Sequence, residues 1–245
     1  MTAPVFLADR DRLVEGARVT LDGPEGRHAA TVRRLVPGEA VVLSDGAGRT
    51  AHCKVTAAAK NRLELDVLDV HDDPPPQQRL VVVQALPKSD RGERAVETMT
   101  EVGVDVIVPW AAARSLAHWR GERTEKALAR WRATAREAAK QARRSWLPDV
   151  TDLASTSQVA GRIRAAAAAV MLHEEATAAI GGIKLPATGD ILLIVGPEGG
   201  LTPEEVAGFS GAGAQPVRLG QTVLRTSTAG TVAAAALLSR TPRWA

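Results

Sequence analysis

Two segments near the C-terminus each combine an apolar run, a glycine-bearing turn and a helix start, and together they constrain the fold most. The first, Ile191 to Leu201, reads Ile-Leu-Leu-Ile-Val-Gly-Pro-Glu-Gly-Gly-Leu. It is followed by Thr-Pro-Glu-Glu, which supplies a helix cap, a first-turn proline and favourable acidic charge. The second, Leu219 to Thr228, reads Leu-Gly-Gln-Thr-Val-Leu-Arg-Thr-Ser-Thr and runs into an alanine-rich helix. Each segment therefore predicts a strand, a turn and a helix in succession.

The glycines in these turns also favour a binding site, because a residue without a side chain lets a ligand approach the main chain closely. Backbone N–H groups left free in such turns can hold a phosphate, a carboxylate or the edge of an adenine. Plain turn chemistry without a ligand is the alternative.

The hydrophobic pattern changes once along the chain. Residues 5–70 hold short alternating strands, among them 40–43, 51–55 and 63–67, which are typical of a small β-barrel. A polar, proline-containing stretch follows, and we expect residues 74–78 to form an extended linker. Beyond it, apolar strands alternate with helices, which predicts an α/β domain with a mainly parallel sheet. The expected strands are 80–86, 104–108, 168–172, 191–195 and 216–219, and the clearest helices are 92–102 and 122–144. The sequence thus predicts a β domain over 1–73 and an α/β domain over 79–245.

Composition excludes several classes of protein. Of the 245 residues, 45% are apolar, which suffices for a packed core. Cys53 is the only cysteine, and its alternating context predicts a buried structural thiol in a reducing, cytoplasmic compartment. No run approaches the ~20 apolar residues of a membrane span, and charges near the N-terminus argue against a signal peptide. The histidines lack paired metal-ligand spacing, so no metal is expected.

Two common nucleotide-binding motifs do not occur. The Rossmann fingerprint G-x-G-x-x-G is missing, because Gly211-Ala-Gly213 lacks the third glycine and follows a helix. The Gly196 to Gly200 turn has no following Gly-Lys-Ser/Thr, so it is not a Walker A loop. Neither a dinucleotide site of the Rossmann type nor ATP hydrolysis accounts for the turns.

One segment carries more positive charge than the chain as a whole. Residues 114–144 hold ten Lys/Arg and three Asp/Glu, whereas the net charge of the whole chain is +3. Basic residues clustered along one helix are typical of a surface that binds phosphates, so we interpret this segment as a candidate RNA track. A solvated helix face is the alternative. Trp119 and Trp131, within the segment, are expected to lie in the core.

Taken together, the two glycine segments resemble one known family. Gly-Pro-Glu-Gly-Gly from 196 to 200, followed by Leu-Gly-x-x-Val-Leu-Arg-Thr from 219 to 226, is similar to the bacterial RsmE-type 16S rRNA uracil-N3 methyltransferases of the SPOUT superfamily. Shorter matches in the family's order and spacing extend the resemblance over nearly the whole chain. They include Lys88 before Arg91-Gly-Glu, Glu101-Val-Gly-Val104, Pro109, Arg114-Ser115, Arg130-Trp131, Glu137-Ala-Ala and Gln141-x-x-Arg144.

The resemblance implies a fold and a cofactor. The C-terminal domain would contain a deep trefoil knot, and the N-terminal domain would be a PUA-like β-barrel that binds RNA. The cofactor would be bent S-adenosylmethionine, held by main-chain groups of the knot without an acidic ribose clamp. The implied cofactor-binding residues are Leu172, Val195, Gly196, Gly200, Leu219, Gly220, Val223 and Leu224.

The resemblance also implies a substrate and a partner. The target would be a uridine in the decoding region of 16S rRNA, on the assembled small ribosomal subunit, and family members are homodimers with the knot at the interface. Uracil N3 lies on the Watson–Crick edge, so the base must be unpaired or flipped. The implied RNA contacts are Arg27, His28, Arg33, Arg34, Lys88, Arg91, Arg114, Arg120, Arg143 and Arg144.

Methylation at N3 requires loss of the imide proton, which places negative charge on O2 and O4 of the uracil. Arg225 adjoins the cofactor loop and is the best candidate to stabilise that charge, a salt bridge within the knot being its alternative role. The family's pattern has Glu between the two threonines after this arginine, whereas this chain has Ser227. Water, a phosphate or acidification of the bound base are the remaining routes for the proton.

Two other functions stay open at this point. A knotted ribose 2′-O-methyltransferase would use similar cofactor loops, and its product would resist alkaline cleavage while the base stayed unmodified. A non-catalytic RNA-binding or ribosome-assembly protein would account for the basic segment and for Ser227. Failure to bind S-adenosylmethionine would favour that second class.

Overall fold

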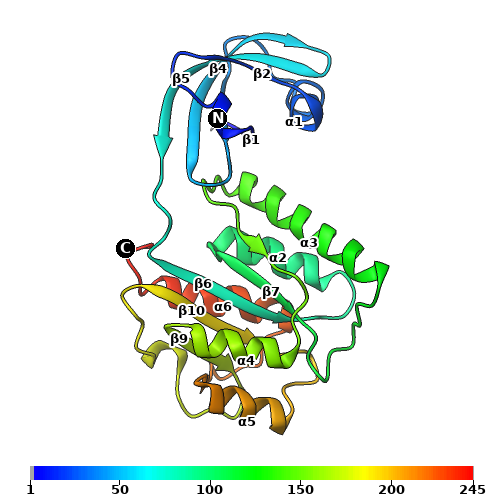
Figure 1. Cartoon of the computed structure of the whole chain (residues 1–245), viewed down its shortest axis with the longest axis vertical. Helices are drawn as coiled ribbons and strands as arrows, with labels where there is room; N and C mark the ends of the chain where they lie inside the picture. The colour runs from blue at the N-terminus through cyan, green and yellow to red at the C-terminus, as the bar shows by residue number, and fades with distance from the viewer. Residues whose placement is uncertain (1–2, 245) are drawn as a thin grey trace. The chain divides into compact units, whose positions relative to one another are not determined.

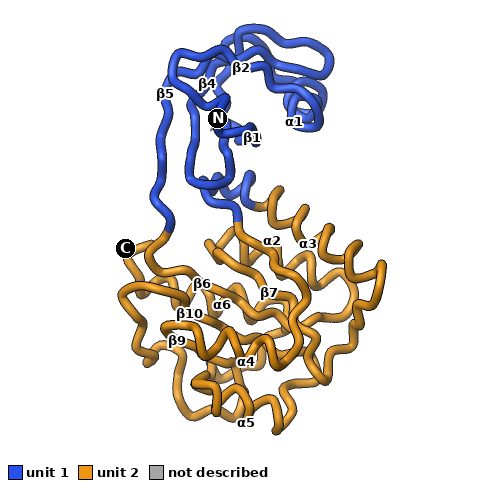
Figure 2. Tube along the Cα trace, viewed as in Figure 1, with its two compact units in different colours: residues 1–75, 139–147 blue, residues 76–138, 148–245 orange. Residues whose placement is uncertain are grey.

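The structure is a computed structural model that describes residues 3–244 (Figure 1). It divides into two compact units, which Figure 2 colours separately. Unit 1 contains the residues up to Pro75 together with Ala139–Leu147, and unit 2 contains Pro76–Ala138 and the residues from Pro148 onward. Unit 1 therefore includes a segment that lies far along the sequence from its strands.

Unit 1 is built on a five-stranded mixed sheet with the order β1-β3-β4-β5-β2. β1 and β3 are parallel, and the other neighbours are antiparallel. Its strands are β1 (Val5–Leu7), β2 (Arg18–Leu21), β3 (Ala40–Ser44), β4 (Arg49–Ala59) and β5 (Arg62–Asp72). The short helices are η1 (Arg10–Arg12), α1 (Gly23–Arg27) and the π-helical turn η2 (His28–Val32).

Alternate residues of these strands form the core of unit 1, as the sequence pattern predicts. Val41, Leu43, Cys53, Val55 and Leu65 are all buried in one cluster. Burial raises the pKa of the Cys53 thiol to about 11, so at neutral pH this side chain is a protonated, unreactive part of the core. The prediction of a structural thiol is confirmed.

The segment Ala139–Leu147 packs within unit 1 through main-chain and side-chain contacts. Ala47 and Trp146 form an antiparallel bridge, and the Trp146 indole N–H donates to the Asp73 carbonyl over 3.1 Å. Lys140 is buried and its ammonium lies 3.0 Å from the Glu25 carboxylate. A lysine predicted to belong to an RNA track is thus part of a buried ion pair.

The turn at Gly48 depends on the lack of a side chain, and this dependence yields a stability prediction. Its φ of +99° lies in the left-handed region, and an added Cβ would meet the Asp73 carbonyl oxygen at 2.5 Å. Gly38 has a similar φ of +96° but open space around an added Cβ, so it is a matched control. Both alanine variants incur backbone strain, and Gly48→Ala should lose about 2 kcal/mol more stability through overpacking. Denaturant unfolding monitored by circular dichroism measures the difference; equal losses would contradict the steric argument.

Unit 2 contains a six-stranded sheet with the order β11-β9-β10-β6-β7-β8, and every neighbouring pair is parallel. Its strands are β6 (Gln78–Ala85), β7 (Val106–Trp110), β8 (Asp149–Val150), β9 (Ala168–Leu172), β10 (Gly189–Val195) and β11 (Gln215–Val217). Its helices are α2 (Arg91–Val102), α3 (Glu122–Gln141, whose last turn enters unit 1), α4 (Thr156–Ala165), η3 (Ile180–Gly182), α5 (Pro203–Ala212) and α6 (Thr226–Leu238). The predicted parallel α/β domain is confirmed.

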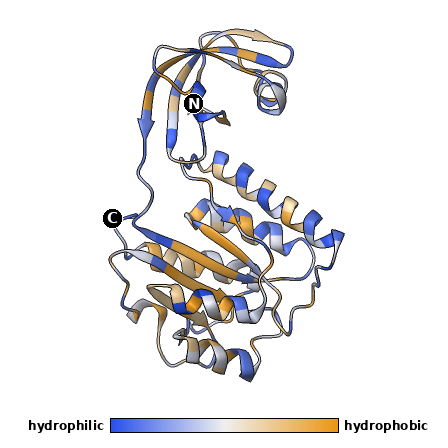
Figure 3. Cartoon of the chain, viewed as in Figure 1, coloured by the Kyte–Doolittle hydropathy of each residue, from blue (hydrophilic) through white to orange (hydrophobic). Residues whose placement is uncertain are grey.

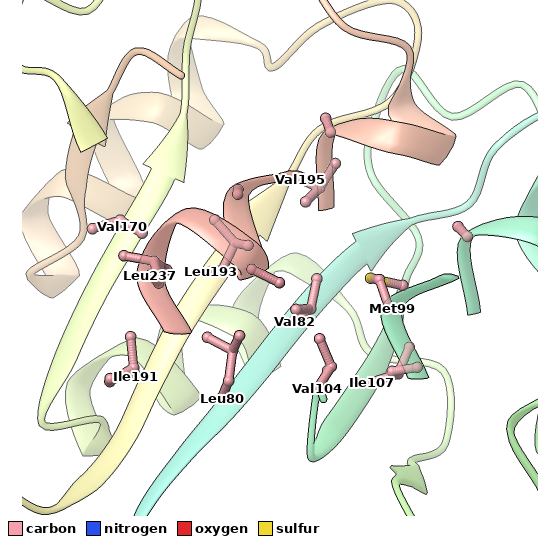
Figure 4. Close-up of a cluster of buried hydrophobic side chains, with 14 of the residues drawn as sticks. Leu80, Val82, Met99, Val104, Ile107, Val170, Ile191, Leu193, Val195 and Leu237 are labelled. Carbon is pink, nitrogen blue, oxygen red and sulfur yellow. The ribbon is translucent and has the colours of Figure 1, made fainter. Parts of the chain in front are cut away.

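Helices cover both faces of this sheet. On one face, Leu80, Val82 and Leu193 pack with Met99 of α2 and Leu237 of α6 (Figure 4). On the other face, alternate strand residues pack with α4 and α5. Figure 3 shows β6 and β7 largely in the hydrophobic colour, as expected for strands buried on both sides.

Helix α3 ends three residues before the predicted boundary. Arg143 takes a φ of +58°, and the Arg144 N–H donates to the Ala139 carbonyl over 2.9 Å. This is a Schellman cap, with arginine in the position that glycine usually occupies. Trp131, within α3, is buried in the core as expected, whereas Trp119, before α3, is only partly buried and packs edge to face against it with ring centroids 5.1 Å apart.

Candidate functional site

A cavity of about 620 Å³ lies in unit 2, where β9, β10 and β11 end. Because these strands are parallel, the loops that follow them meet at the same edge of the sheet. The cavity is lined by Arg91, Arg114, residues 172–174, residues 195–201, residues 218–226 and Ala229.

The first glycine segment forms one wall of the cavity. β10 ends at Val195, and Gly200 takes a φ of +70°, which only glycine adopts readily. Thr202 then caps α5: its hydroxyl accepts from the Glu205 N–H, and the Glu205 carboxylate accepts from the Thr202 N–H. This capping box fixes the point at which the loop ends.

The second glycine segment also lines the cavity. An added Cβ on Gly220 would meet nothing within 4 Å, so a ligand can approach its main chain. Val223 and Leu224 are 79% and 36% exposed, so both present apolar surface to the cavity that they line. Arg225 is the N-cap residue of α6, and its carbonyl accepts from the N–H groups of Thr228 and Ala229 over 2.9 Å. Its backbone is therefore fixed while its exposed side chain borders the cavity.

The lining of the cavity is positively charged. It includes the guanidinium groups of Arg91, Arg114, Arg218 and Arg225, against carboxylates only from Glu174 and Glu198. Glu198 is already engaged, since it accepts from the Lys88 N–H over 3.1 Å and lies 3.6 Å from Arg91. Within residues 3–244, the side chain of Arg225 forms no ion pair, so its alternative role in an internal salt bridge has no support. An excess of arginine suits an anionic ligand such as RNA.

The structure brings the predicted cofactor residues together. Leu172, Val195, Gly196, Gly200, Leu219, Gly220, Val223 and Leu224 all line this one cavity. Of the other predicted residues, Arg225, Arg91 and Arg114 line it as well. Lys88 does not line the cavity, but its backbone N–H donates a hydrogen bond to the carboxylate of Glu198, which does.

The remaining predicted RNA contacts lie away from this cavity. Arg120 is exposed in the loop before α3, in unit 2. Arg27, His28, Arg33, Arg34, Arg143 and Arg144 belong to unit 1. Arg27, Arg33, Arg34 and Arg143 are exposed, whereas His28 and Arg144 are half-buried. The His28 ring packs edge-on against the Phe6 ring, with the two centroids 5.8 Å apart.

The basic segment is partly neutralised by its neighbours. Arg132 lies 2.8 Å from Asp152, Arg130 lies 3.6 Å from Glu93, and Lys126 lies 3.9 Å from Glu122. Together with the buried Lys140, these pairs leave a smaller basic surface than the count of charges predicts. The interpretation as an RNA track therefore depends on individual arginines rather than on the whole segment.

Sequence reasoning missed several residues of the lining. They are His173, Glu174, Pro197, Glu198, Gly199, Leu201, Arg218, Gln221, Thr222, Thr226 and Ala229. Most are direct neighbours of predicted residues, so extending each motif by two positions would have found them. Ser227, by contrast, is buried and does not belong to the lining.

Other kinds of site find no support in the described residues. Between residues 3 and 244, no group of three or more His, Cys, Asp or Glu side chains is placed to hold a metal ion. None of the helices in that range has both the length and the apolar character that a membrane crossing requires.

Comparisons with known proteins agree with this fold and cavity. Residues 74–238 match the RNA methyltransferase domain family, and residues 21–68 match the RNA methyltransferase PUA domain family. The ribosomal RNA small subunit methyltransferase E of Mycobacterium tuberculosis is 50% identical over 94% of this chain and 89% of its own length. The protein of that name from Bacillus subtilis is 28% identical over 95% of this chain and 94% of its own.

A solved structure gives the same result in three dimensions. The ribosomal RNA small subunit methyltransferase E of Neisseria gonorrhoeae, bound to S-adenosylmethionine, superposes with a TM-score of 0.87 at 29% identity. The match covers 98% of each chain. The chain thus matches a PUA domain family and an RNA methyltransferase domain family, and it is 50% identical to the Mycobacterium tuberculosis protein over 94% of its length. The chain belongs to the ribosomal RNA small subunit methyltransferase E family.

Proposed function

We propose that this protein transfers a methyl group from S-adenosylmethionine to N3 of a uridine of 16S rRNA in the small ribosomal subunit. The observation that carries the proposal is the convergence of both glycine segments on one cavity with an arginine-rich lining. The names of its relatives, and the S-adenosylmethionine bound to the Neisseria gonorrhoeae protein, support methylation of small-subunit rRNA with this cofactor.

The lining fits the chemistry of this cofactor. Gly200 and Gly220 leave open space where a side chain would stand, so main-chain groups can reach an adenine or ribose. The exposed Val223 and Leu224 offer apolar contact to a ring. We expect the chain to pass through a trefoil knot at these loops, as the family resemblance implies. S-adenosylmethionine would supply an electrophilic methyl group on its sulfonium.

Arg225 is the proposed catalytic residue. Its fixed backbone at the N-terminus of α6 holds the guanidinium beside the cavity, where it stabilises the negative charge that develops on O2 and O4 of the uracil. Ser227 is buried and outside the lining, so we infer that it does not accept the N3 proton. The N-terminus of α6 carries a partial positive charge from the helix dipole, which also stabilises negative charge on the uracil.

Exposed arginines in both units would hold the RNA. Arg27, Arg33 and Arg34 in unit 1 and Arg120 in unit 2 present guanidinium groups to solvent. Phosphate contacts of this kind position an RNA without reading its sequence. The target base itself must leave any pairing, because its N3 is otherwise covered.

The salt dependence of RNA binding tests these contacts. Arg120→Ala and Arg143→Ala should each lower the slope of log affinity against log salt by about one unit, since each removes one phosphate contact. Affinity for S-adenosylmethionine should not change, because neither residue lines the cavity. Filter binding to 16S rRNA fragments at several salt concentrations gives the slope. An unchanged slope in both variants would show a solvated face instead.

We further propose that the protein is a cytoplasmic homodimer that requires no metal. Val232 of α6 is an exposed apolar side chain outside the cavity lining, and a second copy of the chain would cover it. Sedimentation of the purified chain tests this part of the proposal.

The decisive experiment compares 16S rRNA from cells with and without this protein. Mass mapping should find one uridine that carries a base methyl group only when the protein is present. A methylated ribose with an unmodified base would instead indicate a 2′-O-methyltransferase. A lack of any difference, with no binding of S-adenosylmethionine in calorimetry, would indicate a non-catalytic RNA-binding protein.

A further inference from the structure

The Arg114 side chain points to the glycine loop of unit 2 rather than only to solvent. Its Nη1 donates to the carbonyl oxygens of Gly199 and Leu201, over 3.1 Å and 3.3 Å. An added Cβ on Gly199 would lie 3.1 Å from the Cβ of Arg114, so the two segments are already in close contact. A guanidinium that bridges two carbonyls of one loop restrains that loop through charge-assisted hydrogen bonds.

A second contact joins the same two segments. The N–H of Ala113 donates to Oε1 of Glu205 over 2.8 Å, while Oε2 of Glu205 accepts from the Thr202 N–H over 2.9 Å. Glu205 is only 4% exposed, so each carboxylate oxygen has a specific backbone donor in a buried setting. The residue that caps α5 therefore also ties the end of the loop to the segment containing Arg114.

The electrostatic surroundings agree with this arrangement. The pKa of Glu204 is held below its usual value by a hydrogen bond from its own backbone N–H, by the Thr202 hydroxyl and by the charge of Arg114. Arg114 thus acts on the start of α5 as well as on the loop that precedes it.

We propose that Arg114 is a positioning residue for the cofactor, acting through the Gly199 and Leu201 carbonyls rather than through an RNA phosphate. The inference rests on the proposed function, because it names how that site is held in shape. The loop from Gly196 to Leu201 forms one wall of the cavity, so a restraint on its carbonyls is a restraint on the ligand's binding surface.

Calorimetry with S-adenosylmethionine on the full-length chain tests the proposal. Arg114→Ala should raise the Kd at least about tenfold, since it removes hydrogen bonds from a charged donor. Arg114→Lys should recover part of that loss, because the ammonium keeps the charge and can donate to the carbonyls, but the shorter side chain does not place its nitrogen where Nη1 of Arg114 lies. Arg162→Ala is the matched control: it removes an exposed guanidinium from α4, outside this cavity, and should leave the Kd unchanged.

A second variant and a second measurement separate the alternatives. Glu205→Gln should also raise the Kd, because the amide nitrogen cannot accept from one of the two N–H donors. The salt slope of RNA binding by Arg114→Ala, measured with saturating cofactor, should equal that of the wild type. A wild-type Kd for Arg114→Ala, or a salt slope lower by one unit, would overturn the proposal. Failure of the wild type itself to bind the cofactor would overturn the proposed function and this inference with it.

Discussion

Replacing Gly196 with valine is expected to abolish measurable binding of S-adenosylmethionine. Gly196 follows the last residue of β10 and lines the cavity. An added Cβ would already lie 3.2 Å from Cδ2 of Leu201, so a branched side chain must displace Leu201 or occupy the space of the ligand. Either outcome removes the close approach of the cofactor to the main chain, and we expect the Kd to rise more than about a hundredfold, or ~3 kcal/mol.

Calorimetry on Gly196→Val and on a control, Gly208→Val, distinguishes a site effect from a general one. Gly208 lies in α5 with open space around an added Cβ, and it is absent from the lining. Unit 1 should stay folded in both variants, because neither residue belongs to it, and circular dichroism checks that the overall fold is kept. Near wild-type affinity in Gly196→Val would remove this glycine from the cofactor site.

Much of the α/β fold could be predicted because its strands are continuous apolar runs. The expected strand 168–172 coincides with β9, and 191–195 falls within β10. Strand β8 was not predicted. It has only two residues, Asp149 and Val150, and two residues are too few to show the alternation of apolar and polar side chains by which a strand is recognised. The position of the Ala139–Leu147 segment in unit 1 was also beyond reach, since it depends on contacts between residues about one hundred positions apart.

In the site, too, features set by neighbouring residues could be predicted, whereas contacts between residues distant in the sequence could not. Both glycine segments could be found because strand, turn and helix signals lie within about ten residues of one another. The hydrogen-bond and ion-pair partners of individual charged side chains could not be found in this way. Arg114 was interpreted from the sequence as a phosphate contact, yet its guanidinium bonds the carbonyls of Gly199 and Leu201. Lys140 counted toward a basic surface, yet it is buried against Glu25. Side-chain pairing across loops has no signature in a single sequence.

Replacing Arg225 with alanine is expected to reduce single-turnover methylation about a hundredfold while changing cofactor affinity little. The side chain borders the cavity and forms no ion pair within residues 3–244, so its removal leaves no buried partner exposed. In the proposed mechanism this variant loses the donor that stabilises charge on the uracil oxygens, and loss of such a donor typically costs ~3 kcal/mol of transition-state stabilisation.

Two further variants identify which property of the site matters. Arg225→Lys should recover only part of the rate, because an ammonium keeps the charge but cannot reproduce the planar fork of a guanidinium. Ser227→Ala should have a mild effect, because the Ser227 side chain is buried and does not line the cavity. Purified small ribosomal subunits with saturating S-adenosylmethionine provide the assay, with calorimetry as the check on binding. A near wild-type rate for Arg225→Ala would refute the electrostatic role. A collapse of the rate in Ser227→Ala, with binding intact, would move the catalytic assignment to that hydroxyl.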